Sequence, residues 1–539
     1  MILRLLVRCF TRLHRFRAFN TAVLRTPGPV ILIPNHVSWI DFLFLGLVLD
    51  DDWKFVTSLE TAQTSWFHRK IMVSKRTFPV DPASPFAVRQ MAEFLNKGGR
   101  LVLFAEGRLS RTGTLMKFFD GSGFLLNKTR AQVIIAYLRG IQRSVFAVHP
   151  GHKRRLPRVT LHCSPLLTSP ARQFERSAEA REFYIAWLFD RATDLRFAVE
   201  MEQGAGTLPD AIRAAAAEQP DKIIIEDLTG RKTYRELLTG AEIFTRLLHR
   251  RLDASPHVGV LLPNSTGMVV TLLALWALGR VPGILNFSTG STAMLACTTL
   301  AQFTCIITSR RFLERSQLDL APLTAAGITF LYLEDLRAAA GPADKLAAWL
   351  RARSGLLFRP RDAAGTAERT AVILFTSGSE GTPKGVRLSH RNLLANVRQI
   401  LSVVDITDND RIFSSLPMFH SFGLTIGTML PLLRGLFVFV YPTPLHYRLI
   451  PILVYDRDCT IMLATNTFLN GYARRAHPYD FRSVRFMFAA AEKLQEATAT
   501  TWSRKFGLRV LEGYGATECS PNLRGQGVAG ASCSFSAAA

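Results

Sequence analysis

The fold of this chain is decided around the stretch Asn35-His36-Val37-Ser38-Trp39-Ile40-Asp41, which separates two apolar runs. The run before it, Val30–Ile33, is made of branched side chains that favour a buried strand, and Pro34 ends it. The run after it, Phe42–Leu49, is long enough for a buried helix. The stretch therefore lies where a strand end meets a helix start, a position at which polar side chains can face a cleft.

His36 and Asp41 are candidates for a catalytic pair. They are five residues apart, about a turn and a half of helix, so a bend at the helix start would let the carboxylate reach the imidazole. A carboxylate on one ring nitrogen fixes the tautomer and leaves the other nitrogen free as a base. Such a pair also arises by chance in long chains, so the rest of the sequence has to decide.

The length and charge of the chain limit its architecture and its partners. With 539 residues and 48% hydrophobic residues it is too long for one core, and we expect two or more domains. The net charge of +24 favours an anionic membrane, nucleic acid or acidic protein as a partner, although a high-GC genome that favours arginine would also contribute. The seven cysteines form no CxxC pair, which argues against a zinc site or disulfide framework and favours a reducing compartment.

The N-terminal residues 1–20 contain no acidic residue, and arginines recur at helical spacing: Arg4, Arg8, Arg12 and Arg15. The segment lacks the uninterrupted apolar core and the cleavage site of a secretory signal. It fits a basic amphipathic helix that lies on a membrane, or an ordinary first helix of a basic domain.

Two later stretches, Val258–Leu285 and Leu416–Tyr441, are apolar enough to suggest membrane spans. Prolines and polar residues interrupt both, so we expect buried strand–helix units instead. Attachment to a membrane would then be peripheral rather than spanning.

Alternating segments predict an α/β fold with sites at the strand ends. In the first part of the chain, we expect strands at 53–56, 76–81, 101–104 and 132–137 and a helix at 87–96. A charged helical stretch over 171–201 leads to Gln203–Thr207, a glycine-containing boundary. The second domain is predicted to have a helix at 208–217, parallel strands at 258–262, 283–286, 304–308 and 329–333, and a looser insert at 338–367.

A second informative stretch, Phe104–Gly113, follows a predicted strand. Gly107 lets the backbone turn tightly beside a substrate, and Arg108 offers a fork that can grip a phosphate through two hydrogen bonds. Arg111 adds charge, and Glu106 can orient the arginine or a substrate hydroxyl. The alternative is a solvated loop with one salt bridge, which the upstream His36–Asp41 unit disfavours.

These residues resemble the glycerophosphate and lysophospholipid acyltransferase family. His36 and Asp41 match its HxxxxD motif, and Glu106-Gly107-Arg108 matches its EGR motif. Residues 76–81, beginning with Arg76, lie at its intermediate substrate-binding block, and residues 134–140 lie at its fourth block. Ala105 and Ala136 stand where the family usually has proline, which affects the expected substrate fit rather than the chemistry. The resemblance implies acyl transfer from an acyl carrier protein or coenzyme A thioester to a glycerophospholipid hydroxyl.

A third stretch, Thr376–Gly385, follows the strand-like run 371–375. Its glycines and hydroxyl residues let backbone N–H groups cradle phosphate oxygens, and Lys384 adds a cation. It is not a Walker A loop, because Lys384 follows a proline and precedes a glycine. It resembles the phosphate loop of adenylate-forming acyl ligases.

Three further blocks resemble the same ligases in the same order: 417–423 with its His420 gate near the acyl site, 490–494 on the adenine side, and 514–518. In the last, the resemblance implies that Thr517 contacts phosphate and that Glu518 holds Mg²⁺ with ATP. The implied ATP-binding residues are Thr376, Ser377, Gly378, Ser379, Gly381, Lys384 and Thr517.

As a whole, the chain resembles bacterial proteins that fuse a 2-acylglycerophosphoethanolamine acyltransferase to an acyl–acyl carrier protein synthetase. The expected parts are a membrane-facing helix (1–20), an acyltransferase domain (21–167), a helical linker (168–206) and the large subdomain of an adenylate-forming enzyme (207–521). We expect the small C-terminal lid, which carries a catalytic lysine in the family, to be absent. Residues 522–539 are a Gly/Ala/Ser-rich tail without a packable core, as in a truncated or frameshifted end.

Three functions remain open on this basis. The first is re-acylation of lysophosphatidylethanolamine at the cytoplasmic face of a bacterial inner membrane, with residual or lost ligase activity. The second is a ligase that activates a fatty acid with ATP and Mg²⁺ and passes it to acyl carrier protein or coenzyme A. The third is a non-catalytic basic membrane protein. We expect no nucleic-acid partner, since no recognisable nucleic-acid module is present.

Overall fold

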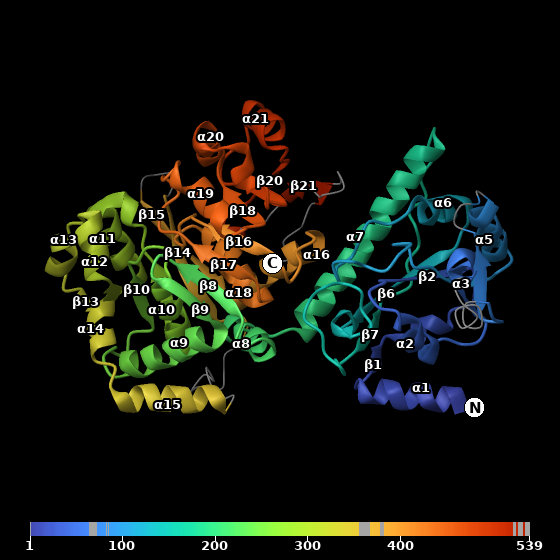
Figure 1. Cartoon of the computed structure of the whole chain (residues 1–539), viewed down its shortest axis with the longest axis horizontal. Coiled ribbons are helices and arrows are strands. Elements are labelled where there is room, and N and C mark those ends of the chain that lie inside the picture. The colour runs from blue at the N-terminus through green and yellow to red at the C-terminus, as the bar shows by residue number, and fades with distance from the viewer. Residues whose placement is uncertain are drawn as a thin grey trace. The chain divides into compact units, whose positions relative to one another are not determined.

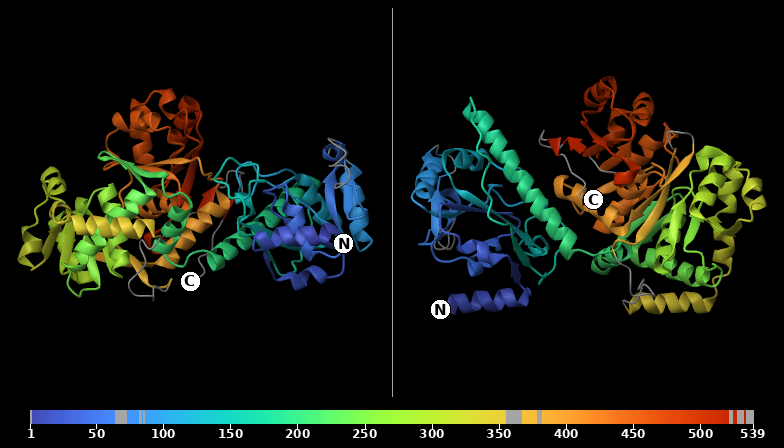
Figure 2. Two further views of the ribbon diagram at one scale, coloured as in Figure 1. Left: turned by 60° about the horizontal axis from the view of Figure 1, so that its bottom comes forward. Right: turned by 180° about the vertical axis from the view of Figure 1, so that it is seen from behind.

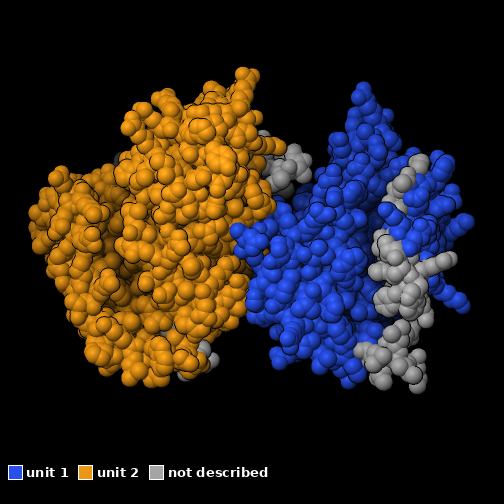
Figure 3. All heavy atoms as spheres, in the orientation of Figure 1, with its two compact units in different colours: residues 1–202, 401–409 blue, residues 203–400, 410–539 orange. Residues whose placement is uncertain are grey.

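The computed structural model describes residues 2–63, 73–81, 84, 86–354, 367–377, 382–520, 524–526 and 532–533 (Figure 1). The chain divides into two compact units (Figure 3). The first comprises residues 1–202 and 401–409, and the second comprises residues 203–400 and 410–539. Both are α/β structures, as the sequence predicts.

The first unit is built on a single sheet. Among its described residues the sheet has seven strands in the order β1-β7-β6-β2-β5-β3-β4, parallel except between β6 and β7. The strands are β1 (Arg17–Phe19), β2 (Val30–Pro34), β3 (Trp53–Ser58), β4 (Thr77–Val80), β5 (Arg100–Val102), β6 (Gln132–Arg139) and β7 (Thr160–Cys163). Every residue of β2 is buried, because β2 lies between β5 and β6 with both faces covered.

Helices cover both faces of this sheet (Figures 1 and 2). They are α1 (Ile2–Leu13), α2 (Asp41–Val48), α3 (Leu59–Gln63), α5 (Phe86–Asn96), α6 (Asp120–Lys128) and α7 (Ser177–Gln203). Side chains of α5, α6 and α7 form a core with one face of β2, and those of α1 and α2 form a core with the other. The predicted strand before residue 35 and the predicted helix after residue 41 are both confirmed.

The described residues of the second unit form two sheets. A six-stranded sheet has the order β13-β12-β10-β11-β14-β15, and a nine-stranded sheet the order β22-β21-β20-β19-β18-β16-β17-β8-β9. The strands of the first are β10 (His257–Val260), β11 (Val281–Ile284), β12 (Cys305–Thr308), β13 (Thr329–Tyr332), β14 (Thr370–Ser377) and β15 (Pro383–Ser389). The strands of the second are β8 (Ile223–Asp227), β9 (Gly230–Thr233), β16 (Arg411–Ser414), β17 (Phe437–Val440), β18 (Ile461–Ala464), β19 (Phe486–Ala489), β20 (Val510–Tyr514), β21 (Arg524–Gln526) and β22 (Ser532–Cys533).

The helices of the second unit flank these sheets. They are α8 (Leu208–Glu218), α9 (Tyr234–His249), α10 (Thr266–Ala277), α11 (Gly290–Ala301), α12 (Arg310–Ser316), α13 (Ala321–Ala325), α14 (Leu333–Ala338), α15 (Pro342–Arg353), α16 (His390–Val403), α17 (Ser421–Leu424), α18 (Leu430–Arg434), α19 (Leu449–Asp456), α20 (Asn466–Arg475) and α21 (Glu496–Phe506). Each sheet has its own buried apolar cluster, one centred on Ile306 and Ile373 and the other on Phe439 and Trp502.

The two long apolar stretches fold as buried units, as predicted. Val258–Leu285 runs through β10, α10 and β11, and α10 is buried along most of its length. Leu416–Tyr441 runs through α17, a π-helical turn, α18 and β17, almost all buried. Among the described residues, no helix combines the length and the apolar character that crossing a bilayer requires.

The prediction of a loose insert at 338–367 is wrong for its first half. Residues 342–353 form α15, a regular helix that begins with a proline in its first turn, where a missing N–H has no cost. Asp344 in that turn accepts hydrogen bonds from Arg246 on α9 and from Arg250, the residue directly after that helix. The alanine, leucine and arginine residues of this segment favour helix, so its composition is compatible with regular structure. Residues 355–366 lie outside the described residues.

Candidate functional site

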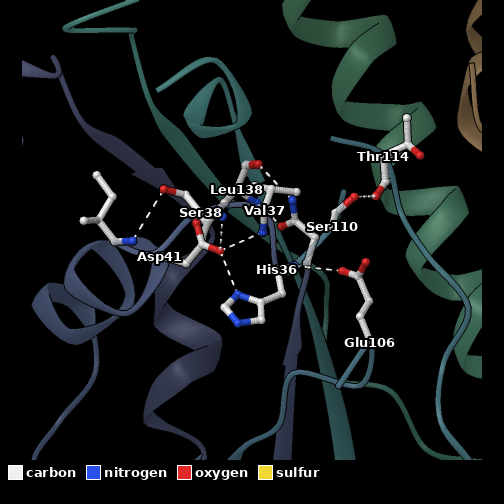
Figure 4. Close-up of polar contacts among 10 residues, drawn as sticks. His36, Val37, Ser38, Asp41, Glu106, Ser110, Thr114 and Leu138 are labelled. Carbon is white, nitrogen blue, oxygen red and sulfur yellow. Dashed lines mark hydrogen bonds and ion pairs between the residues drawn. The ribbon is translucent and has the colours of Figure 1, made fainter. Parts of the chain in front are cut away.

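The end of β2 and the start of α2 bring His36 and Asp41 together (Figure 4). Nδ1 of His36 lies 3.0 Å from Oδ2 of Asp41. The Asp41 side chain is fully buried in the first turn of α2, whereas the His36 side chain is 24% exposed. The imidazole ring stacks on Phe104, with the ring centroids 4.0 Å apart. Because Nδ1 faces the carboxylate, Nε2 is the nitrogen available to a substrate proton.

The Asp41 carboxylate also organises the backbone that precedes it (Figure 4). The same Oδ2 atom accepts hydrogen bonds from the N–H groups of Val37, at 2.8 Å, and Ser38, at 3.0 Å. An aspartate at a helix N-terminus that accepts backbone N–H groups is in a favourable place for a negative charge. The carboxylate therefore fixes both the imidazole and the turn that carries it.

Glu106 and Ser110 hold the backbone of His36 from the other side (Figure 4). The N–H of His36 donates to Oε1 of Glu106 at 2.8 Å, and the carbonyl of His36 accepts from the N–H of Ser110 at 2.7 Å. The second carboxylate oxygen of Glu106 accepts from the N–H of Met116 at 2.9 Å. The His36 segment and the Glu-Gly-Arg segment are thus one hydrogen-bonded structure, although 70 residues separate His36 from Glu106.

Glu106 is completely buried. Burial raises the pKa of this carboxyl to about 8, although the hydrogen bonds from the N–H groups of His36 and Met116 oppose the rise. Its position, facing backbone groups rather than the surface, favours a role in positioning His36 over direct contact with a substrate.

Asn35 ties the end of β2 to β6. Its side-chain oxygen accepts from the N–H of Leu138 at 2.7 Å, and its side-chain nitrogen donates to the carbonyl of Leu138 at 3.1 Å. The Asn35 side chain thus pairs with β6 in the way that the backbone of a further strand residue would. It holds Asn35, directly before His36, in register with β6 beyond the end of β2.

Arg108 lies at the surface of the turn that follows Glu106. Gly107 has a φ of +63°, and a Cβ there would lie 2.8 Å from the ring of Phe119, so both the conformation and the space favour glycine. The Arg108 guanidinium lies 5.6 Å from the centre of the Phe119 ring, and the Lys117 ammonium lies 5.9 Å from it. Arg111 is exposed nearby in the sequence. Within the described part of the chain no acidic side chain pairs with Arg108 or Lys117, so the turn presents positive charge beside the His36 segment.

Lys117 and Phe119 were not predicted from the sequence as site residues. The available signal was their position directly after the Glu-Gly-Arg stretch, but the hydrogen bonds from Met116 to Glu106 and from Phe119 to Ala105 are what show that this segment folds back toward His36.

Arg76 is placed differently from the other predicted substrate ligands. Its guanidinium donates to the carbonyls of Leu49, at 2.9 Å, and Asp50, at 3.0 Å, and lies 3.5 Å from the carboxylate of Asp51. These carbonyl and carboxylate groups belong to the residues that follow the C-terminal end of α2 and form the next turn. In this structure Arg76 stabilises that turn, and its role as a substrate ligand stays a prediction.

In the second unit the described residues that flank the predicted phosphate loop lie on two paired antiparallel strands. Thr376 and Ser377 end β14, and Lys384 lies opposite Thr376 on the antiparallel strand β15. The short 3-10 turn Thr517–Cys519, which carries Glu518, contacts β15. Gly378, Ser379 and Gly381 lie outside the described residues.

The charges of Lys384 and Glu518 fit the phosphates and the Mg²⁺ of a nucleoside triphosphate. The Lys384 and Glu518 side chains are both exposed. Mg²⁺ is commonly held by one or two carboxylates together with phosphate oxygens and water, so Glu518 is the residue that would hold it beside a nucleotide.

His420 is exposed in the turn before α17, and its ring centroid lies 4.7 Å from that of Phe419. Phe419 in turn packs edge-to-face on Phe287, with the centroids 5.1 Å apart. At the end of β19, Ala491 has a φ of +71°, a conformation that alanine adopts only at a cost in energy. Such strain is frequent in ligand-contacting loops, and it supports a role for the predicted adenine-side block.

The buried carboxyl of Glu106 predicts a pH dependence of stability. Since its pKa is raised, the folded protein binds more protons than the unfolded chain between about pH 4.5 and pH 8, and stability falls as the pH rises through this range. The Glu106→Gln variant lacks this titration. We expect the midpoint of thermal unfolding of the wild type, measured relative to the variant, to fall from pH 5 to pH 8. A difference in unfolding midpoint between the two proteins that stays constant from pH 5 to pH 8 would contradict the raised pKa of Glu106.

Comparisons with known proteins agree with this division of the sites. Residues 15–138 match the family model described as Acyltransferase, and residues 212–532 match the one described as AMP-binding enzyme. A medium-chain fatty-acid–CoA ligase of Escherichia coli K12 is 27% identical over 338 residues, covering 59% of this chain and 57% of the relative. A long-chain-fatty-acid–CoA ligase of Salmonella typhimurium is 31% identical over 163 residues, covering 29% of this chain and 28% of the relative. The matched part of the chain thus spans little more than half the length of the first of these curated relatives and less than a third of the second.

Among solved structures, a benzoate CoA ligase from Burkholderia xenovorans LB400 superposes with a TM-score of 0.52 at 20% identity, covering 60% of this chain and 64% of the other. The N-terminal domain of FACL13 from Mycobacterium tuberculosis superposes with a TM-score of 0.50 at 20% identity, covering 59% and 78%. These likenesses establish the adenylate-forming fold of the second unit. The chain belongs to the AMP-binding enzyme family, and it carries an acyltransferase-family domain at residues 15–138, ahead of the AMP-binding part.

Proposed function

We propose that the first unit transfers an acyl chain from a thioester to the free hydroxyl of a lysophospholipid, with lysophosphatidylethanolamine as the acceptor. The observation that carries the proposal is the 3.0 Å contact between Nδ1 of His36 and the buried Asp41 carboxylate. It leaves Nε2 available as a base. The exposed cations Arg108 and Lys117 lie on the segment that is hydrogen-bonded to His36, and they supply a place for the phosphate of the acceptor.

In this mechanism Nε2 of His36 takes the proton of the acceptor hydroxyl as its oxygen attacks the thioester carbonyl. Asp41 stabilises the imidazolium that forms. The tetrahedral intermediate then collapses, the carbon–sulfur bond breaks, and the imidazolium returns its proton to the departing thiolate. The products are the diacyl phospholipid and the free thiol of acyl carrier protein or coenzyme A.

For the second unit we propose ATP-dependent activation of a fatty acid. The curated relatives are named fatty-acid–CoA ligases, and the exposed Lys384 and Glu518 fit the phosphates and Mg²⁺ of the nucleotide. The thiol acceptor would be acyl carrier protein or coenzyme A. A fatty acid–thiol ligase as the main activity is the second candidate, since the AMP-binding match covers the larger part of the chain.

We also propose peripheral attachment to the cytoplasmic face of the bacterial inner membrane, partly through α1. Phe10 of this helix and His14, the residue directly after it, pack against Phe44 of α2, with ring centroids 6.4 Å and 5.6 Å from that of Phe44. The side chains of Arg8, Arg12 and Arg15 stay exposed. A helix that is anchored on one side and basic on the other suits an anionic lipid surface.

The first prediction concerns the base. His36→Ala should lower acyl transfer from a preformed thioester by on the order of 10² to 10⁴-fold, because it removes the proton acceptor. Asp41→Asn should also be severe, since it removes the charge that stabilises the imidazolium. Transfer is measured with labelled donor and lysophosphatidylethanolamine, and His249→Ala, an exposed histidine on α9, is the control. Near-full transfer in a folded His36→Ala protein would refute the assignment.

The second prediction concerns the phosphate site. Arg108→Gln and Lys117→Gln should each raise KM for the lysophospholipid and leave KM for the thioester unchanged, because only the acceptor carries the phosphate. Lys128→Gln is a matched control, since its ammonium also lies over a phenylalanine ring, Phe124, at 6.0 Å. A change confined to KM for the donor would mean that the two pockets are reversed.

The third prediction concerns the nucleotide. Lys384→Ala and Glu518→Gln should weaken Mg-ATP binding, measured by calorimetry, and should leave acyl transfer from a preformed thioester intact. Lys232→Ala, an exposed lysine on β9, should bind Mg-ATP as the wild type does. Unchanged binding in both site variants would place the nucleotide elsewhere.

A further inference from the structure

A turn beside the His36 segment exposes apolar side chains to solvent. It spans residues 144–148 and follows the 3-10 helix Ile141–Arg143. Val145 is 52% exposed, Phe146 42% and Val148 47%. Single exposed apolar residues are common on protein surfaces, but three in four consecutive positions at the tip of a tight turn form a patch that water solvates poorly. We call residues 144–148 the apolar turn.

The apolar turn is hydrogen-bonded to the stretch that carries the base. The N–H of Trp39 donates to the carbonyl of Phe146 at 3.2 Å, and Ser38 and Ala147 form an antiparallel bridge. Trp39 lies between His36 and Asp41 in the sequence, and its side chain is 54% exposed. Trp39 therefore extends the apolar surface to the edge of the candidate active site.

A basic segment runs along the apolar turn. Arg154 donates its N–H to the carbonyl of Arg143 at 2.7 Å and pairs with Ser144 as a parallel bridge. The exposed side chains of this segment include Arg154, Arg155 and Arg158, and an exposed leucine, Leu156, lies among them. Arg139 is paired with Glu200, and the Asp408 carboxylate accepts the N–H of His152, so the exposed positive charge beside the apolar turn comes from Arg154, Arg155 and Arg158.

Helix α1 continues the same surface. The Phe10 ring lies 6.3 Å from the Phe146 ring, centroid to centroid, so the end of α1 packs against the apolar turn. Leu13 at that end is exposed, and so are Arg12 and Arg15. The apolar turn is thus bordered by positive charge from two segments that are far apart in the sequence.

We propose that the apolar turn and Trp39 insert into the surface of an anionic lipid bilayer and so present His36 to acceptors within it. This inference rests on the proposed acyltransferase function. An apolar tip with a basic border is the pattern of an interfacial membrane contact, in which apolar side chains enter the headgroup region and cations meet anionic lipid. A polyanion such as RNA would satisfy the charge but would leave the apolar side chains in water. A neutral bilayer would cover the apolar side chains and leave the charge unmatched.

Insertion of the apolar turn would also fix the position of His36 relative to the lipid surface. Because the turn is bonded to Trp39, and Trp39 belongs to the His36–Asp41 turn, insertion sets the height of the base above the lipid headgroups. A lysophospholipid hydroxyl lies at that level of a bilayer, so an acceptor would need to move only slightly out of the membrane to reach His36.

The test is flotation of the full chain with phosphatidylcholine vesicles, with and without phosphatidylglycerol. The wild type should float with the anionic vesicles and much less with the neutral ones. Val145→Ser/Phe146→Ser should lower flotation with anionic vesicles at least tenfold. Arg154→Gln/Arg155→Gln should lower it and also reduce its sensitivity to salt. Leu228→Ser/Leu445→Ser, which changes two exposed leucines of the second unit, should float like the wild type.

An activity measurement separates this inference from the proposed function. With lysophospholipid in detergent micelles, Val145→Ser/Phe146→Ser should transfer acyl chains at the wild-type rate, which also shows that the variant is folded. With acceptor in anionic vesicles its rate should fall together with flotation. Equal flotation of variant and wild type, or strong flotation of the wild type with neutral vesicles, would overturn the inference. If Arg154→Gln/Arg155→Gln lost binding to RNA but floated with anionic vesicles like the wild type, the result would overturn the inference in favour of a polyanion. Absence of transfer in micelles by the wild type would instead overturn the proposed function.

Discussion

One carboxylate oxygen organises the turn on which the candidate acyltransferase site depends. Oδ2 of Asp41 accepts hydrogen bonds from the backbone N–H groups of Val37 and Ser38 and lies 3.0 Å from Nδ1 of His36. Because Asp41 is also in the first turn of α2, this atom fixes the helix start, the turn and the imidazole together. Aspartate is suited to this position because its short side chain can receive several donors without leaving the helix N-terminus. Asparagine could offer its one carbonyl oxygen to the same N–H groups, but it would lack the negative charge that stabilises an imidazolium.

The sheet explains why two motifs that are distant in the sequence lie together. Strands β2 and β5 are parallel neighbours, so their carboxyl ends meet at one edge, and the segments that follow them carry His36 and Glu106. Glu106 uses both of its oxygens on backbone N–H groups, one from His36 and one from Met116. The candidate site is therefore built from backbone contacts between neighbouring loops, and its exposed cations lie on one of these hydrogen-bonded loops.

Much of this organisation could be predicted from the sequence, and the remainder depends on contacts that a sequence does not display. The strand before His36, the helix after it and the buried character of Val258–Leu285 follow from apolar runs and their interruptions. The inward orientation of Glu106, the approach of Lys117 to Phe119 and the bond from Trp39 to Phe146 join residues that local patterns treat separately. Helix α15 differs from the expected looser insert because alanine and arginine both favour helix, and because Asp344 has two arginine partners at the C-terminal end of α9.

The pairing of Asn35 with Leu138 has a consequence for the order in which the first unit folds. The two residues are 103 positions apart, and β2 has β6 as its neighbour along its whole length. Closing so long a loop costs chain entropy before any contact is gained, and parallel pairings of this kind form slowly. During synthesis the ribosome must release the chain beyond Arg139 before β2 can become a central strand. The turn around His36 therefore acquires its final shape late, and a nascent chain that ends before β6 has the complete HxxxxD sequence without the structure that supports it.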